Sequence, residues 1–153
     1  MALVLHGIFT VTIPYLLLEA SRPHPFLWFD IGPLEPGGLV LLLGGIALYV
    51  WPLARLLRRR TSALPGQTPT TLDTGGPYRF VRHPLLLGVI LIMFGEAMYF
   101  ESTSLIVYAA SYWSWLNYFV WSREEPELHR FFGGSYANYC RKTPRWLPRF
   151  PPS

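Results

Sequence analysis

The sequence contains little charge and almost no cysteine. Charged residues make up 14% of its 153 residues and apolar residues 51%, and the mean hydropathy is +0.26. A typical soluble domain has about 25% charged residues, so this composition indicates an integral membrane protein. The single cysteine, Cys140, excludes an internal disulfide framework and a metal site made of several cysteines.

Two further patterns are missing. The net charge of +4 would suit nucleic-acid binding if basic residues lined a soluble face between aromatic residues. The basic residues instead flank apolar runs, so no nucleic-acid partner is expected. The first residues also lack the basic region and small-residue cleavage site of a signal peptide, and we therefore expect them to remain as a membrane span.

Four apolar stretches approach the length of about 20 residues that a helix needs to cross a bilayer. They cover residues 2–19, 38–57, 84–100 and 105–121. The last two are separated by only a short polar turn, so they should form an antiparallel hairpin. Residues 61–76 are rich in Thr, Pro and Gly and should not form a regular helix. A short helix is predicted at about 124–132, followed by a tail rich in Gly, Tyr, Arg and Pro.

The basic residues predict the orientation of these spans. Arg55, Arg58, Arg59 and Arg60 end the second span. If that end is cytosolic, twelve of the 13 Lys and Arg residues lie on the cytosolic side and only Arg22 lies outside. This asymmetry follows the positive-inside rule. We predict a multi-pass, all-α integral membrane protein, a single domain over 1–153, with both termini and the C-terminal segment 122–153 in the cytosol.

This topology brings two polar segments to one membrane face. Arg82 and His83 lie at the start of the third span, and Arg123, Glu124 and Glu125 follow the fourth. Carboxylates and aromatic faces attract cations, whereas Arg pairs with carboxylates, so a shared site would suit a small zwitterionic or cationic ligand. Aromatic side chains are close by in the sequence, at Tyr78, Tyr118 and Trp121.

Each of these features also has a simpler interpretation. Arg82 and His83 could anchor the chain to lipid phosphates. Glu124 and Glu125 could be ordinary carboxylates in the first turn of a helix, and the aromatic residues an interfacial belt. The spacing of His129 and Cys140 relative to the Glu pair matches no common zinc arrangement, so no metal is predicted.

An ordered series of motifs resembles a known family. The motifs are Gly76-Pro77-Tyr78, Arg82-His83-Pro84, Gly88, Glu124-Glu125-x-x-Leu128, Phe132-Gly133-x-x-Tyr136-x-x-Tyr139 and Pro144-Arg145-x-x-Pro148. Over roughly residues 70 to 149, the chain resembles the isoprenylcysteine carboxyl methyltransferase and phospholipid methyltransferase family of integral membrane enzymes.

The resemblance implies a methyltransferase that binds S-adenosylmethionine in a pocket formed by the cytosolic loop, the hairpin helices and the C-terminal tail, without a Rossmann domain. The sequence indeed has no Gly-x-Gly-x-x-Gly motif. The acceptor would be lipid-like or membrane-partitioned, would enter from the bilayer, and would be methylated on a carboxyl, amine or thiol group. The cofactor positions fall on Thr70, Thr71, Leu72, Asp73, Tyr78, His83, Pro84, Leu85, Leu86 and Glu124. Arg123 and Glu125 are predicted as substrate-binding or orienting groups.

The chain departs from the family pattern at two positions. Leu86 stands where the family often has Tyr, and Val120 stands where the carboxyl methyltransferase branch has an Arg associated with the substrate. These two residues favour the alternative hypothesis, a non-catalytic lipid-binding or assembly subunit that keeps the family scaffold. A transporter is disfavoured because the spans contain no central charge pair.

Overall fold

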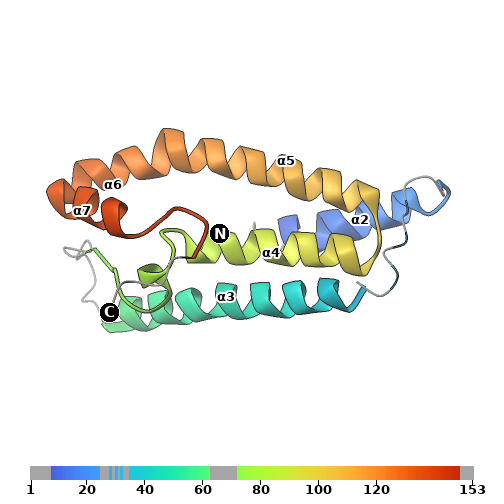
Figure 1. Ribbon diagram of the computed structural model, residues 1–153, viewed down its shortest axis with the longest axis horizontal. Helices are drawn as coiled ribbons and strands as arrows, with labels where there is room; N and C mark the ends of the chain where they lie inside the picture. The colour runs from blue at the N-terminus through green and yellow to red at the C-terminus, as the bar shows by residue number, and fades with distance from the viewer. Residues whose placement is uncertain are drawn as a thin grey trace. The chain divides into compact units, whose positions relative to one another are not determined.

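The computed structural model describes residues 8–24, 28, 30, 32, 35–62 and 72–148, with the side chains of residues 35 and 59–62 left out. All regular secondary structure in these ranges is helical (Figure 1), which confirms the predicted all-α class. The elements are the π-helix η1 (Ile8–Thr12), α2 (Ile13–Ser21), α3 (Glu35–Ser62), the 3₁₀ helix η4 (Gly76–Arg79), α4 (Pro84–Tyr99), α5 (Thr103–Phe119), the π-helix η5 (Val120–Glu124), α6 (Glu125–Phe132) and α7 (Gly134–Lys142). An isolated bridge joins Trp28 to Ser102.

One described helix is long and apolar enough to cross a membrane. It is the part of α3 from Pro36 to Arg58, with 23 residues. The segments Ile8–Ser21 and Pro84–Tyr99 are apolar but shorter, and α5 has 17 residues. A helix overlaps each predicted span, although residues 2–7 of the first span and 63–71 of the predicted loop lie outside the described residues. Helix α3 continues to Ser62, two residues into the segment 61–76 that was predicted to be non-helical. The number of membrane crossings stays a prediction.

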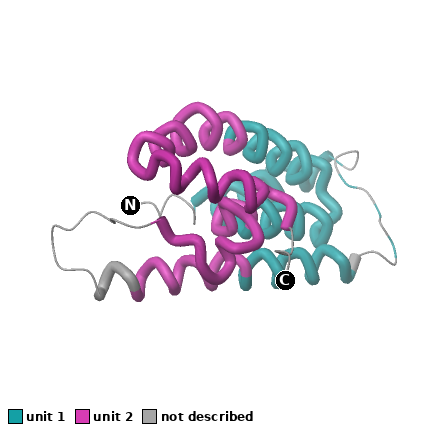
Figure 2. The backbone as a smooth tube through the Cα atoms, turned by 60° about the vertical axis from the view of Figure 1, so that its left-hand side comes forward, with its two compact units in different colours: residues 1–47, 88–115 teal, residues 48–87, 116–153 magenta. Residues whose placement is uncertain are grey.

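The chain forms two compact units (Figure 2). Unit 1 comprises Met1–Ala47 and Gly88–Trp115, and unit 2 comprises Leu48–Leu87 and Leu116–Ser153. Helices α3, α4 and α5 each contribute residues to both units.

Unit 1 is held together by close contact between the backbones of α3 and α4. A Cβ atom on Gly95 would lie 2.5 Å from the Leu42 nitrogen, and one on Gly45 would lie 2.7 Å from the Ile92 nitrogen. Glycine is needed at these points because any side chain would collide with backbone. Small residues are a common means of bringing apolar helices together in membranes.

Polar contacts join α2 and η1 to α5 within unit 1. The Ser21 hydroxyl donates to the Leu17 carbonyl at 2.6 Å and lies 2.9 Å from the Ser104 hydroxyl. The Tyr108 hydroxyl donates to the Phe9 carbonyl at 3.0 Å. These bonds satisfy hydroxyl groups that would otherwise be costly to place among apolar residues.

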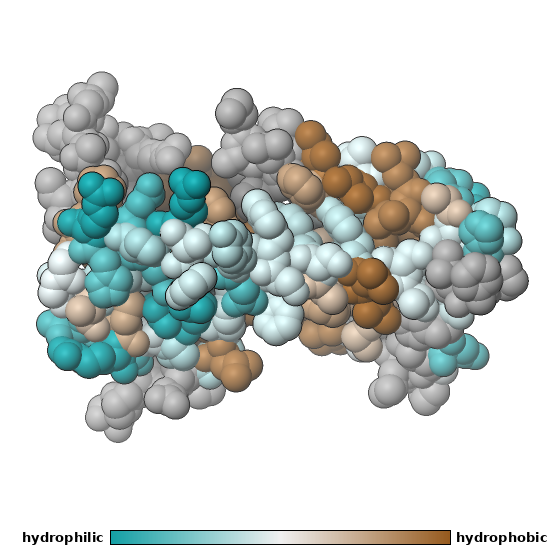
Figure 3. Space-filling view, turned by 90° about the horizontal axis from the view of Figure 1, so that it is seen from above, coloured by the Kyte–Doolittle hydropathy of each residue, from teal (hydrophilic) through white to brown (hydrophobic). Residues whose placement is uncertain are grey.

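Unit 2 contains two short helices after α5, of which the sequence predicted one. Helix α6 ends at Gly133, whose positive φ of 52° suits glycine. The segment predicted to be a tail rich in Gly, Tyr, Arg and Pro instead forms a further helix, α7. This helix ends at Lys142, and the next residue, Thr143, is extended, as expected for a residue that precedes proline. Hydrophilic residues gather on the surface over α6 and α7 (Figure 3).

Candidate functional site

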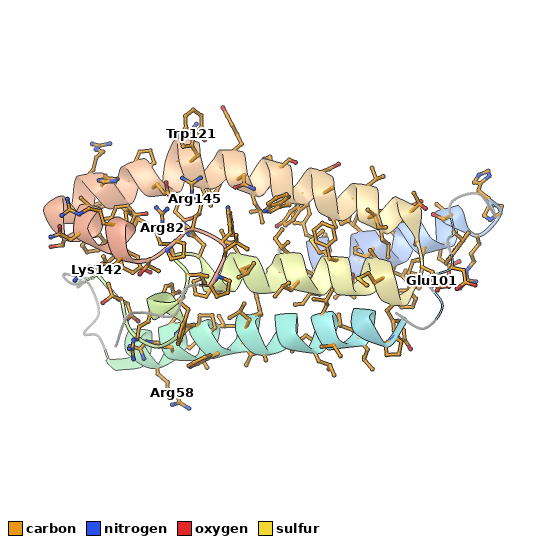
Figure 4. The ribbon with its side chains drawn as sticks, in the orientation of Figure 1. Arg58, Arg82, Glu101, Trp121, Lys142 and Arg145 are labelled. Atoms are coloured by element: carbon orange, nitrogen blue, oxygen red, sulfur yellow. The ribbon has the colours of Figure 1, made fainter. Side chains whose placement is uncertain are left out.

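The carboxylate of Glu125 lies at the centre of unit 2. Its Oε1 accepts hydrogen bonds from Arg82 Nη1 at 2.8 Å and from Arg145 Nε at 2.9 Å, and its Oε2 accepts one from Arg145 Nη2 at 2.6 Å. The two guanidinium groups lie together, while Arg58 and Trp121 point outward (Figure 4). Because paired contacts of this kind fix orientation as well as distance, Glu125 joins the loop before α4 to the segment after α7.

The imidazole of His83 lies between two carboxylates. Its Nδ1 is 3.3 Å from Glu124 Oε1, and its Nε2 is 3.7 Å from Glu125 Oε1. The ring of Trp146 lies 5.8 Å away between centroids. Only 4% of the His83 side chain is exposed, against 37% for Glu124 and 12% for Glu125. Glu124 is therefore the carboxylate of this pair that a ligand can reach.

Hydrogen bonds tie the loop before α4 to α7 and to the segment that follows it. The Arg82 backbone N–H donates to the Pro144 carbonyl at 2.9 Å, and the Tyr139 hydroxyl donates to the Tyr78 carbonyl at 2.7 Å. The Trp146 indole N–H donates to Asn117 Oδ1 on α5 at 2.7 Å. Segments distant in sequence thus converge around His83.

The same loop is attached to α3. Arg55 Nε lies 2.8 Å from Asp73 Oδ2, and Arg55 Nη2 lies 3.1 Å from Asp73 Oδ1. Asp73 Oδ1 also accepts the Gly75 backbone N–H at 3.0 Å. Asp73 therefore connects a helix side chain to a turn of its own loop.

Burial and neighbouring charges shift the pKa values of several side chains in unit 2. Burial raises the pKa of Glu125, but the hydrogen bonds from Arg145 and the charges of Arg82 and Arg145 outweigh it, and the pKa is lowered from 4.5. Burial lowers the pKa of Arg82, but its interactions with Glu125, Cys140 and Tyr136 together outweigh burial, so that the pKa of Arg82 is raised. Burial raises the pKa of both Tyr136 and Tyr139. Glu125 and Arg82 are therefore ionised at neutral pH, and the phenols of Tyr136 and Tyr139 are neutral.

Most of the residues predicted for the site belong to unit 2. Tyr78 lies in η4, His83 and Glu124 face each other, and Leu72 and Asp73 are half-buried. Pro84 is the buried first residue of α4, followed by the half-buried Leu85 and Leu86. Thr70 and Thr71 lie outside the described residues. Arg123 is exposed on η5, and it is Arg82 and Arg145 that bind Glu125. The roles of all these residues stay predictions.

Several residues of the cluster were not among the predicted site residues. They are Arg55, Asn117, Tyr139, Arg145 and Trp146. Tyr139 and Arg145 belong to the motifs that carry the resemblance, which was the signal that could have identified them. Arg55 and Asn117 gave no such signal. Within the described ranges, no three His, Cys, Asp or Glu residues are grouped so that they could hold a metal ion.

Over its described residues, the structure defines the class as an all-helical protein with one helix long and apolar enough to cross a membrane and with a cluster of charged side chains in unit 2. The sequence profile of the phospholipid methyltransferase family matches residues 36–135, which is more than half of the chain. The chain therefore belongs to the phospholipid methyltransferase family, which confirms the resemblance.

Two curated proteins are similar to the chain. Protein-S-isoprenylcysteine O-methyltransferase from Schizosaccharomyces pombe is 32% identical over 81 residues, which cover 52% of this chain and 34% of that protein. Protein-S-isoprenylcysteine O-methyltransferase B from Arabidopsis thaliana is 25% identical over 169 residues, covering 97% of this chain and 84% of that protein. The match thus spans about a third of the first relative. No solved structure gives a significant match.

Proposed function

We propose that the protein is an S-adenosylmethionine-dependent methyltransferase that acts on a lipid-like or membrane-partitioned acceptor. The observation that carries this proposal is the convergence of the buried His83 and Glu125 with the partly exposed Glu124. The three come from two separate motifs of the family pattern, and a methyltransferase is what both relatives are named. If Arg82 and His83 only bound lipid phosphates and the Glu pair only began a helix, the two segments would not need to meet.

The cluster fits a ligand that carries hydroxyl and ammonium groups. Glu124 is a partly exposed carboxylate, and carboxylates accept hydrogen bonds from such donors. Among the described residues, His83 Nε2 is a buried polar atom without a hydrogen-bond partner. Buried polar atoms normally have one, so this atom is suited to face a bound molecule. Glu124, His83 and Tyr78 would hold the cofactor, with the apolar Leu85 and Leu86 beside them in sequence.

S-adenosylmethionine supplies a methyl group on a positively charged sulfur. The task left to the protein is to position the reactants in line and to exclude water. Glu125 is a weak base because its pKa is lowered and both its oxygens accept hydrogen bonds from arginines. Its role in this proposal is to orient Arg82, Arg145 and the neighbouring His83. Arg123, exposed on η5, is the proposed contact for the acceptor.

The proposal includes a topology of four membrane spans with the site on the cytosolic face. It is supported by α3, by the apolar Ile8–Ser21 and Pro84–Tyr99 segments, and by the distribution of Lys and Arg. Reporter fusions to both ends of the chain test it, and the expected result is a cytosolic signal from each. An external signal from either end would contradict the topology.

A second candidate is a non-catalytic subunit that keeps the scaffold. Two residues favour this candidate. Leu86 stands where the resemblance leads one to expect a Tyr ring beside the cofactor, and Val120 stands where it leads one to expect an Arg beside the substrate. In that case the protein would bind S-adenosylhomocysteine but would transfer no methyl group.

The test of the proposed function is to incubate membranes that contain the protein with methyl-labelled S-adenosylmethionine and to identify the lipid-extractable product. The expected result is a labelled methyl ester, methylated amine or thioether, formed in smaller amount at limiting S-adenosylmethionine in membranes with the Glu124→Gln variant. Cofactor binding without any labelled product would favour the second candidate. If a folded sample shows neither cofactor binding nor a labelled product, both candidates are contradicted.

A further inference from the structure

Arg55 makes a two-point contact with the loop that begins at Leu72. The contacts are the paired bonds from Nε and Nη2 to the two carboxylate oxygens of Asp73, at 2.8 and 3.1 Å. A pairing of this form fixes the plane of the guanidinium as well as its distance. From sequence, Arg55 is simply the first of the basic residues that end an apolar span. The structure instead shows it turned toward the loop to which the resemblance assigns cofactor positions.

The turn after Asp73 is shaped around this guanidinium. A Cβ atom on Gly75 would lie 2.5 Å from Arg55 Nη2 and 3.3 Å from Cζ. Gly76 has a φ of +60°, and a Cβ there would lie 3.3 Å from Arg55 Nη1. The arginine therefore packs directly against loop backbone, and glycine at position 75 leaves the space for it.

The loop is also held by other residues of unit 2. The Tyr139 hydroxyl binds the Tyr78 carbonyl, and the Pro144 carbonyl binds the Arg82 N–H. Arg55 supplies the attachment on the side of α3. The loop that carries Tyr78 and leads into His83 is thus fixed between a membrane helix and the C-terminal segment.

We propose that Arg55 is a positioning residue of the cofactor site, which holds Asp73 and the Gly75–Gly76 turn so that Tyr78 and His83 face the cofactor. This rests on the proposed function. It follows that the geometry of the Arg55 side chain, and not only its positive charge near the membrane, is required. It also follows that Asp73 contributes to cofactor binding through Arg55.

Two substitutions separate geometry from charge. Arg55→Lys keeps the positive charge but loses the paired contact. Gly75→Ala keeps both charged residues, and the extended backbone of Gly75, with φ −96° and ψ 167°, is open to alanine. The added Cβ would displace the guanidinium from Asp73. The matched controls are Arg58→Lys, at an exposed basic residue one turn further along α3, and Gly134→Ala, where a Cβ would meet nothing within 4 Å.

The first measurement is calorimetric titration of the full-length protein in detergent with S-adenosylhomocysteine. Arg55→Lys and Gly75→Ala should each raise Kd about tenfold, because residues that act as one unit lose their coupling when either is disturbed. Both controls should bind as the wild type does.

The second measurement needs no ligand. Gly75→Ala leaves every trypsin site in place, so cleavage after Arg79 in η4 reports how firmly the loop is held. Cleavage should be faster in Gly75→Ala than in the wild type or in Gly134→Ala. If the wild type binds S-adenosylhomocysteine and Arg55→Lys and Gly75→Ala bind it with the same affinity, this inference is overturned, whereas the proposed function is not. Absence of binding by the folded wild type would overturn both.

Discussion

The two units are built from different interactions. By sequence, unit 1 contains one basic and five acidic residues, whereas unit 2 contains twelve basic and four acidic residues. Unit 1 is joined by glycine contacts between helix backbones, and unit 2 by charged hydrogen bonds centred on Glu125. The packing of α3 against α4 in unit 1 requires small residues at the contact points but no particular polar or charged side chains. Charged groups held away from water are costly, so their concentration in unit 2 marks the part of the molecule where a ligand is expected.

The substitution expected to destabilise unit 2 most is Glu125→Gln. The substitution leaves the guanidinium groups of Arg82 and Arg145 half-buried without a counter-charge, and removing one partner of a buried ion pair costs about 3 kcal/mol or more. The free energy of unfolding, measured by denaturant titration in detergent, should fall by that amount.

Glu127→Gln is the matched control, because Glu127 is exposed on the same helix, α6. It should leave the stability within about 0.5 kcal/mol of the wild type. Equal stabilities of the two variants would show that unit 2 does not depend on the Glu125 pairing.

The corresponding break in unit 1 is Gly95→Ala. The added Cβ would lie 2.5 Å from the Leu42 nitrogen and 2.9 Å from the Gly38 carbonyl oxygen, both of which are backbone atoms that cannot rotate away. Overpacking of this kind costs about 2 kcal/mol. Thermal unfolding in detergent is the measurement.

The control for this substitution is Gly44→Ala on α3, where a Cβ would meet nothing within 4 Å. Since alanine is the better helix former, this variant should be as stable as the wild type or slightly more stable. If Gly95→Ala unfolds at the same temperature as Gly44→Ala, the backbones of α3 and α4 are not in close contact at Gly95.

The sequence predicts the apolar part of the fold well. The span expected at 84–100 is α4, Pro84–Tyr99, and the one expected at 105–121 is α5, Thr103–Phe119, because runs of apolar residues determine helices locally. The boundary after α5 was harder to predict, since η5 and α6 continue the helix without a break at Glu124 and Glu125.

The cluster was only partly predictable. His83, Glu124 and Glu125 could be grouped because a hairpin brings its two ends to one face. The partners of Asp73 and Glu125 could not be predicted in the same way. Arg55 and Arg145 lie 18 and 20 residues from them, and pairings at such distances are decided by the tertiary fold. Arg145 stood in a recognisable motif, whereas Arg55 looked like a charge that only orients a span.

A smaller effect is expected from Glu124→Gln. Glu124 is partly exposed, and its carboxylate lies 3.3 Å from His83 Nδ1, so its loss should affect the ligand more than the fold. Affinity for S-adenosylhomocysteine should fall about tenfold, in line with the loss of a charge-assisted hydrogen bond, while the unfolding temperature changes little. Calorimetry and thermal unfolding measured on the same sample check both parts. A loss of stability equal to that of Glu125→Gln would make Glu124 a structural residue.

The smallest effect is a dependence of stability on acid. The folded-state pKa of Glu125 is lowered from 4.5, so its stabilisation is fully present above that value and is lost as the pH falls through the lower, folded pKa. The stability difference between the wild type and Glu125→Gln should therefore shrink as the pH is lowered below 4.5. Denaturant titrations of both proteins across this range provide the measurement, and parallel pH profiles would contradict the pairing.

The central claim is that unit 2 binds S-adenosylmethionine. Calorimetric titration of the folded wild-type protein with S-adenosylhomocysteine tests it most directly, with Glu127→Gln as a control that should behave like the wild type. We expect saturable binding at one site per chain, with lower affinity in Glu124→Gln. A folded wild-type sample that releases or absorbs no heat of binding, and whose unfolding temperature is the same with and without the compound, would contradict it.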